Sequence, residues 1–147
     1  LYTGHAQAAD SLDAAVTEAV VGVESRYGVP ISVVVVGDMR PGPGELALVA
    51  ALAEACQNAV RHGAPPVSVY LEVRPRAIEA FVKDNGEGFD PATIAADRHG
   101  VRDSIVGRMR RAGGEATIRR LARGTEIALS VPRSDILEET APNGRTQ

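Results

Sequence analysis

Apolar positions along the chain switch between a helical period and a strand period, and this switching divides the sequence into elements. Apolar residues recur every three or four positions over about 10–27 and again over about 43–61, which predicts two helices. Between them, the short β-branched run at 31–36 predicts a buried strand. Four later segments alternate apolar and polar residues and predict two hairpins, with strands at 66–73, 77–84, 115–121 and 125–131.

The stretch between the two hairpins, 85–114, is rich in glycine and predicts a long loop with one helix over about 101–112. Consecutive hairpins with helices segregated to one face predict an α+β fold. The expected architecture is a two-layer α/β sandwich with a mostly antiparallel sheet. An all-parallel nucleotide-binding fold is disfavoured, because the hairpin connections are too short to hold helical crossovers.

Composition excludes several classes of function. The 147 residues suffice for one domain with a real core, and 44% of them are hydrophobic. A net charge of −3 argues against a general binder of nucleic acid or of membrane surfaces. The single cysteine, Cys56, excludes an internal disulfide framework and a cysteine-rich zinc site. No apolar run reaches the 18 residues of a membrane span.

A polar stripe interrupts the apolar surface of the second predicted helix. Glu54, Asn58 and His62 recur at intervals of four residues, which places their side chains on one face of a helix, with apolar residues on both sides. This arrangement fits a largely covered helix whose stripe faces a cleft, but a solvent-exposed stripe explains it equally well. His62, directly before Gly63, also suits a helix C-terminus and its dipole.

A second motif, KDNGEGFDP at 83–91, follows the second strand of the first hairpin. Asp84 ends an apolar strand, and Gly86 and Gly88 allow the backbone to turn sharply and approach a ligand closely. A carboxylate fixed at a strand end can accept a hydrogen bond from an exocyclic amine such as that of adenine. The alternative is a plain Asn-Gly turn.

Taken in order, the motifs resemble those of the GHKL ATPase superfamily over roughly residues 30–132. EACQNAVRHG resembles its N box, DNGEGF its first glycine box, RHGVRDSIVGRMRRAGG a variant second glycine box and lid, and GTEIALSVP its closing element. The resemblance implies the Bergerat fold. The run from VVVVGDMRPG to the N box is similar to sensor histidine kinases that signal to NarL-like response regulators. The segment DRHGVRDSIVGRMRRAGG is similar to actinobacterial kinases with a PspC-type membrane segment.

The resemblance also implies a role for each matching residue, with ATP and Mg²⁺ as cofactors. Asn58 is expected to bind Mg²⁺ through its side-chain carbonyl, and Glu54 to orient or deprotonate the attacking nucleophile. Asp84 is expected to bind the adenine amino group. The remaining nucleotide-binding positions are expected to be Arg61, His62, Gly86, Gly88, Gly100, Val101 and Thr125, with Gly100 and Val101 at a helix N-terminus over the phosphates.

The variant second glycine box keeps only Gly100 of the fuller glycine pattern, which leaves its grip on the γ-phosphate undefined. Arg108, Arg110 and Arg111 follow on the same predicted helix. A solvated basic face is the default interpretation of these three, and contact with phosphate or with a partner domain is the alternative.

The usual phosphoacceptor motif, a histidine followed by an acidic residue on a dimerisation helix, does not occur in this sequence. We therefore expect the chain, which begins at Leu1 rather than Met, to be a piece of a longer protein. Segment 1–29 is expected to lead from the missing dimerisation domain, 30–133 to form the ATP-binding catalytic domain, and 134–147 to be a disordered tail.

We also expect a monomeric fragment that forms the cytoplasmic part of a membrane-anchored kinase. Its expected partners are the missing acceptor domain and a response regulator of NarL type, and nucleic acid is not among them.

Two rival functions stay open from the sequence. The first is an anti-sigma-factor serine kinase of the same superfamily, whose pattern lacks the helix-bearing lid at 101–114. The second is a non-catalytic interaction domain that retains a nucleotide-binding fold. The joint presence of Glu54, Asn58, Asp84, Gly86 and Gly88 argues against the second.

Overall fold

The structure, a computed structural model, describes residues 10–86 and 96–136, with the side chains of 96–99 left out of the description. Within these residues the chain forms the elements α2 (Leu12–Tyr27), β1 (Ile31–Val36), α3 (Pro43–His62), β2 (Val67–Val73), β3 (Ala77–Lys83), α4 (Ala96–Arg111), β4 (Glu115–Arg120) and β5 (Thr125–Pro132). No helix in this part of the chain is both long enough and apolar enough to cross a bilayer.

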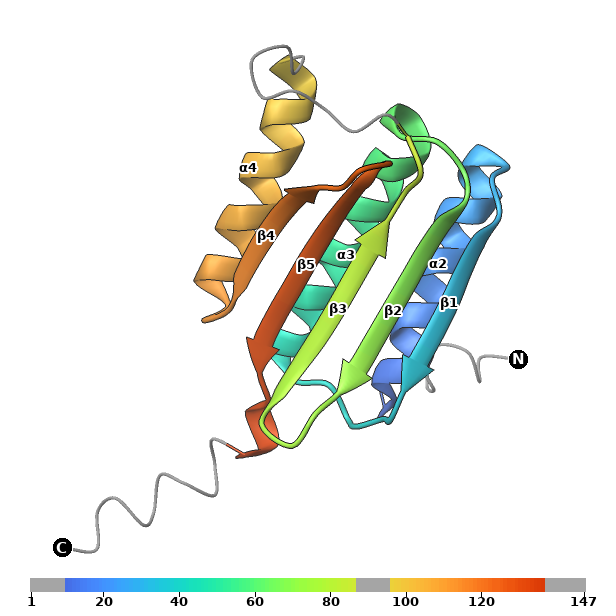
Figure 1. Cartoon of the computed structure of the whole chain (residues 1–147). Coiled ribbons are helices and arrows are strands. Elements are labelled where there is room, and N and C mark those ends of the chain that lie inside the picture. Colours follow the sequence, from blue (N-terminus) through green and yellow to red (C-terminus); the bar gives the residue numbers. More distant parts are fainter. Residues whose placement is uncertain (1–9, 87–95, 137–147) are drawn as a thin grey trace, which may run out of the picture.

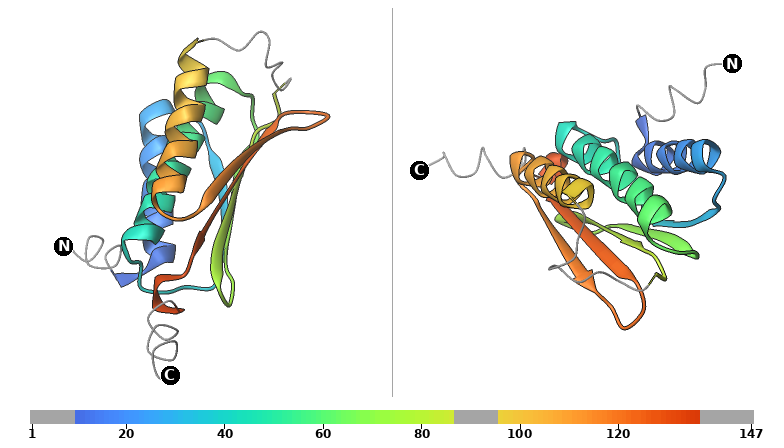
Figure 2. Two further views of the ribbon diagram at one scale, coloured as in Figure 1. Left: turned by 90° about the vertical axis from the view of Figure 1, so that its left-hand side faces the viewer. Right: turned by 90° about the horizontal axis from the view of Figure 1, so that it is seen from above.

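The strands of the described residues form one five-stranded mixed sheet in the order β1-β2-β3-β5-β4. β1 runs parallel to β2, because α3 connects them as a crossover, and the other neighbouring pairs are antiparallel. The helices α2, α3 and α4 lie on one face of the sheet, with α3 between the other two (Figures 1 and 2). The predicted α+β two-layer sandwich is confirmed.

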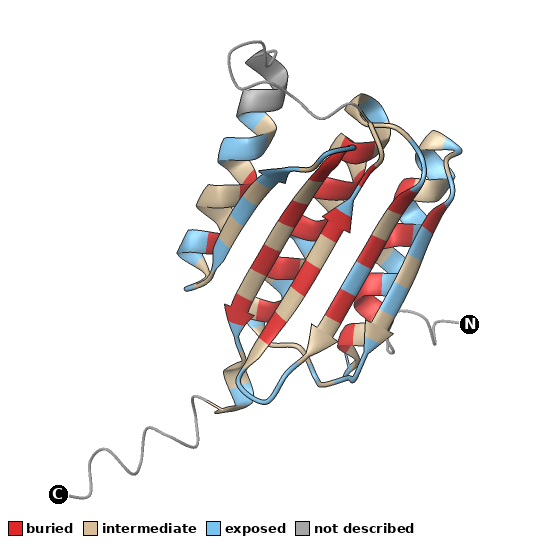
Figure 3. Ribbon diagram, viewed as in Figure 1, coloured by how far each residue is buried: buried red, intermediate tan, exposed pale blue. Residues whose placement is uncertain are grey.

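The core lies between the helix layer and the sheet. Positions along β2, β3 and β5 alternate between buried and more exposed residues, as the banding of these strands in Figure 3 shows, so each of the three gives one face to the core. Apart from Glu45, the largest fully buried side chains are apolar and come from all layers, including Leu12, Leu48, Leu52, Leu71, Ile78, Ile105, Met109 and Leu129. α2 therefore belongs to the same core as residues 30–133, and the suggestion that segment 1–29 leads from another domain stays a prediction.

Asp38, in the loop after β1, fixes the start of α2. Ser11 is the N-cap, and its Oγ accepts a hydrogen bond from the N–H of Ala14 at 3.0 Å. The same Oγ donates to Asp38 Oδ2 at 2.7 Å, and the N–H of Asp13 donates to Asp38 Oδ1 at 3.0 Å. The helix ends at Gly28, whose φ of 68° is the left-handed C-cap conformation that favours glycine.

β1 differs from its prediction as a buried strand. It is an edge strand, and only Ile31 is buried, whereas Val34 is 53% exposed and Val36 is 43% exposed. The prediction was wrong because a short β-branched run has the same composition in a central strand as in an edge strand that helices cover on one face only.

Two helices also differ from the sequence prediction. α4 begins at Ala96, five residues before the expected start, because the polar segment 96–100 carries no apolar period to announce it. On α3, one of the two apolar faces beside the polar stripe is partly open, since Leu46 is 46% exposed and Ala50 is exposed. The prediction that both of these faces are covered was therefore wrong in part.

A buried carboxylate joins the start of α3 to the chain after β5. Glu45 is fully buried, and its Oε1 accepts from the N–H of Gly42 at 2.9 Å and from Ser134 Oγ at 3.0 Å. Its Oε2 accepts from the N–H of Ser134 at 2.7 Å. Residues 134–136, expected to start a disordered tail, are instead helical, and residues 137–147 lie outside the described residues.

Candidate functional site

Asp84, at the end of β3, is held in a space that three glycines leave open. It is 8% exposed, and its Oδ1 accepts from the N–H of Gly86 at 2.8 Å. A Cβ on Gly63 would lie 2.7 Å from Asp84 Oδ1, and a Cβ on Gly124 would collide with the Asp84 carbonyl oxygen. The N–H of Asp84 donates to the carbonyl of Thr125 at 3.1 Å. The carboxylate is thus positioned by backbone from three separate segments.

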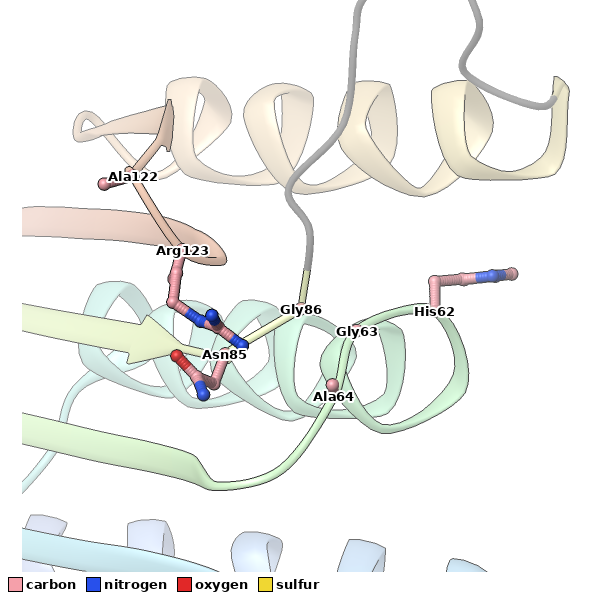
Figure 4. A pocket seen from close by; sticks show the side chains of 7 residues that line it. All are labelled: His62, Gly63, Ala64, Asn85, Gly86, Ala122 and Arg123. Atoms are coloured by element: carbon pink, nitrogen blue, oxygen red, sulfur yellow. The ribbon is translucent and has the colours of Figure 1, made fainter.

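An open cavity of about 730 Å³ lies next to this carboxylate, between the end of α3, the segment after β3 and the β4–β5 turn. Its lining residues are His62, Gly63, Ala64, Asn85, Gly86, Ala122 and Arg123 (Figure 4). Asp84 does not line the cavity itself, but it contacts Gly63 and Gly86, which do. Arg123 extends from the turn toward the Asn85–Gly86 segment, which adds a positive charge to the cavity (Figure 4).

Asn58, one turn before His62 on α3, carries a buried oxygen without a hydrogen-bond donor. Its Oδ1 is inaccessible to solvent and makes no hydrogen bond within the described part of the chain. Such an orphaned acceptor is costly unless a ligand satisfies it, and an amide oxygen is a ligand that Mg²⁺ accepts. No three His, Cys, Asp or Glu side chains form a metal site among the described residues.

Glu54, one turn before Asn58, is held by α4. Its Oε1 accepts from Ser104 Oγ at 3.2 Å and lies 3.7 Å from Nη2 of Arg108. The Glu54 end of the polar stripe therefore faces α4 rather than open solvent. Glu54 lies eight residues before His62, or about 12 Å along the helix axis. That spacing puts Glu54 at one end of the site and the cavity at the other.

The other predicted site residues lie in different surroundings. His62 and Gly86 line the cavity. Thr125 is buried, and its carbonyl oxygen accepts the hydrogen bond from the N–H of Asp84, whereas Arg61 is exposed on the last turn of α3. Gly88 lies outside the described residues.

Gly100 and Val101 lie inside α4, because this helix begins four residues before Gly100. The expectation that they form a helix N-terminus was therefore wrong. Their N–H groups lie within the span of α4, where N–H groups point to carbonyls of the preceding turn. The half-buried Val101 packs against the core instead.

Sequence reasoning missed two contributors to the site. Arg123 lines the cavity, and the only signal for it was its position directly before the Gly124-Thr125 pair. Ser104 contacts Glu54 from 50 residues away, and the helical pattern of α4 gives no sign of that contact. For Arg108 the default interpretation of a solvated basic face was wrong in part, because its Nη2 lies 3.7 Å from Glu54 Oε1, whereas Arg110 and Arg111 are exposed.

Cys56 takes no part in chemistry at this site. It is fully buried on α3, and burial raises the pKa of its thiol to about 12. The thiolate needed for nucleophilic or metal chemistry is therefore scarce at neutral pH. It packs as a small apolar residue in the hydrophobic core.

Structures of histidine kinases are among the solved structures that this chain resembles. One is the blue-light activated histidine kinase of Erythrobacter litoralis EL346, with a TM-score of 0.63 and 19% identity over 83% of this chain and 42% of that one. Another is the mycobacterial sensor histidine kinase MprB, with a TM-score of 0.62 and 17% identity over 84% of this chain and 95% of that one. A third is a structure of the histidine kinase domain of the Erythrobacter protein, with a TM-score of 0.61 and 20% identity over 88% of this chain and 64% of that one.

At these identities the structural matches establish the fold alone. The chain spans less than two thirds of the length of both Erythrobacter structures. A search of curated proteins found no match. A sequence-family model described as a histidine kinase-like ATPase domain matches residues 6–125, which is most of the chain. The chain therefore belongs to the histidine kinase-like ATPase domain family.

Proposed function

We propose that this chain is the ATP-binding catalytic domain of a two-component sensor histidine kinase. It would bind Mg-ATP and transfer the γ-phosphoryl group to a histidine on a separate dimerisation domain of the same protein. The resemblance of the sequence motifs to sensor histidine kinases further implies that a response regulator of NarL type receives the phosphoryl group. It also implies that the kinase is anchored in a membrane with this domain in the cytoplasm. The domain alone is a monomer, because the dimer contacts belong to the acceptor domain.

The observation that carries the proposal is the orphaned Oδ1 of Asn58, one turn from the positioned carboxylate of Glu54. A solvated polar stripe would show neither feature. At the other end of the site, the nearly buried Asp84 and the adjoining cavity provide an acceptor for an amine and room for a base. His62 and Arg123 at the cavity suit a ligand that carries phosphate.

In the proposed reaction, an imidazole nitrogen of the acceptor forms a P–N bond to the γ-phosphorus. The bond from that phosphorus to the bridging β,γ-oxygen breaks, which yields phosphohistidine and ADP. Mg²⁺, when bound, would supply neutralisation of the phosphate charge, and Asn58 Oδ1 would be the atom of this chain that holds it. The Glu54 carboxylate accepts a hydrogen bond from the N–H group of the other imidazole nitrogen, or takes the proton of that group. Asp84 fixes the base, so most of the rate gain comes from positioning.

Titration of the chain with a fluorescent ATP analogue, with and without Mg²⁺, tests the binding part. Asp84→Ala should abolish binding, and Asn58→Ala should remove the dependence on Mg²⁺. Arg76→Ala, in the β2–β3 hairpin turn outside this site, is the matched control and should bind like the unsubstituted chain. Unchanged binding by both site variants would refute the proposed site.

Incubation with labelled ATP tests the transfer part. The chain alone should stay unlabelled, since it lacks the acceptor, whereas the longer protein with its dimerisation domain should gain an acid-labile phosphohistidine. Label on a histidine of the isolated chain would contradict the proposal.

The serine kinase alternative rests on the family match, because this domain type also occurs in anti-sigma-factor kinases. It predicts an acid-stable phosphoserine on a separate protein substrate. Nucleotide binding without any transfer would instead favour a non-catalytic binding domain.

A further inference from the structure

We propose that Arg108 and Ser104 of α4 are positioning residues that orient the Glu54 carboxylate for phosphoryl transfer. This inference rests on the proposed function and assigns a role to two residues that no family motif defines. Both contacts reach the same carboxylate oxygen, Oε1, with Ser104 Oγ at 3.2 Å and Arg108 Nη2 at 3.7 Å. The other oxygen, Oε2, is then the one that meets the nucleophile.

α4 presents these two residues from a fixed position. Ser104 and Arg108 are four residues apart, so they lie on one face of the helix. Each directly precedes a fully buried anchor, Ile105 after Ser104 and Met109 after Arg108, and both anchors belong to the hydrophobic core. The core therefore sets the rotation of α4, and that rotation sets the place of the two polar side chains.

The charges at Glu54 favour a specific contact over a solvated basic face. The Glu54 side chain is 25% exposed, and that of Arg108 is 40% exposed. The Nε of Arg108 is buried without a hydrogen-bond acceptor in the described part of the chain. Arg110 and Arg111, on the same helix, are both exposed. A partly buried guanidinium beside a carboxylate limits the rotation of that carboxylate.

A positioning role predicts a loss in transfer rate without a loss in nucleotide affinity. In the longer protein that carries the acceptor histidine, Arg108→Met should lower the rate of phosphohistidine formation at saturating Mg-ATP at least tenfold. The Kd for a fluorescent ATP analogue, measured on this chain, should change less than twofold. Arg108→Lys should restore part of the rate, and Ser104→Ala should show a smaller loss. Arg110→Met is the matched control and should leave both quantities unchanged.

A double-mutant cycle tests whether Arg108 acts through Glu54. If it does, Arg108→Met should lower the rate less than twofold in a Glu54→Gln background. Equal losses of transfer rate in the Glu54 and Glu54→Gln backgrounds would overturn the inference. A tenfold weaker Kd for the ATP analogue, with an unchanged transfer rate at saturating Mg-ATP, would also overturn it, because Arg108 would then be a phosphate ligand. If Arg108→Met does not fold by circular dichroism, Arg108→Lys and Ser104→Ala provide the same comparison.

The two proposals fail in distinguishable ways. If the unsubstituted chain binds no nucleotide, the proposed function fails. If it binds nucleotide and the longer protein transfers phosphate at the same rate with Arg108→Met, only the positioning role fails.

Discussion

Gly63 and Asp84 are in such close contact that no other residue fits at position 63. A Cβ there would lie 2.7 Å from Asp84 Oδ1 and nearer still to its carboxyl carbon. Gly63 ends α3, yet its φ of −95° is open to any residue, so the need for glycine comes from space rather than from conformation. The end of the helix that carries Asn58 is thereby joined to the carboxylate expected to read the base.

Gly63→Ala should therefore displace the Asp84 carboxylate and weaken nucleotide binding at least tenfold. Overpacking of this kind costs about 1–3 kcal/mol of stability. Gly22→Ala is the matched control, because a Cβ at Gly22 on α2 meets nothing within 4 Å. That variant should gain roughly 0.5–1 kcal/mol and bind normally. The check is urea unfolding together with analogue titration, and normal binding by Gly63→Ala would contradict the account.

Glu45→Ala should destabilise the fold by about 3 kcal/mol, because it removes a buried carboxylate that accepts charge-assisted hydrogen bonds from Gly42 and Ser134. The N–H of Ser134 would then lose its acceptor. Urea unfolding at neutral pH measures the loss. Glu18→Ala, at an exposed position of α2, should stay within about 0.5 kcal/mol of the unsubstituted chain. Equally small losses of unfolding free energy in Glu45→Ala and Glu18→Ala would mean that the Glu45 hydrogen bonds contribute nothing to stability.

Asp38 should give stability a dependence on acid pH. Partial burial raises the pKa of Asp38, but the hydrogen bonds from Asp13, Ser11 and Met39 outweigh it and hold the pKa below its ordinary value of 3.8. A depressed folded-state pKa means that the stabilisation is complete above 3.8 and is lost as pH falls through the folded-state value.

Asp38→Asn should therefore lower stability by about 1 kcal/mol at neutral pH and by less in acid, where the two proteins converge. Urea unfolding of both proteins across this pH range measures the difference. A constant difference at every pH would contradict the predicted linkage.

Cys56 should report on nucleotide binding. Its pKa of about 12 and its burial protect the thiol, so a thiol reagent at mildly alkaline pH should react only when the fold opens. If the proposed function holds, Mg-ATP at about 100 times its Kd should slow this labelling by about 100-fold, since only the closed fold binds nucleotide. Asp84→Ala, tested in the same way, should show no protection. Fast labelling of the unsubstituted chain would show that the thiol is accessible in the native fold.

The sequence pattern predicted the hairpins and the helix order, because local periodicity and turn chemistry determine them. It also placed Glu54, Asn58 and His62 on one face of a helix and Asp84 at a strand end, whereas their roles at the site stay predictions. It could not place β1 at the sheet edge, since an edge strand and a central strand differ only in whether one or two neighbouring strands pair with them. The contacts of Glu54 with Ser104 and of Glu45 with Ser134 span 50 and 89 residues. Only the tertiary fold creates such contacts, and no spacing rule on a single helix reveals them.

The Glu45–Ser134 contact has a consequence for where this domain can be cut. The family match stops at residue 125, and β5 stops at Pro132. A recombinant version that ends at Pro132 would keep the Gly42 N–H at Glu45 but lose both donors from Ser134, and one that ends at residue 125 would lose β5 as well. The version that ends at Pro132 would bury a carboxylate with most of its hydrogen bonds missing, at the first turn of the helix that carries Asn58. The smallest useful expression unit therefore extends through Ser134, beyond the limit that sequence comparison draws.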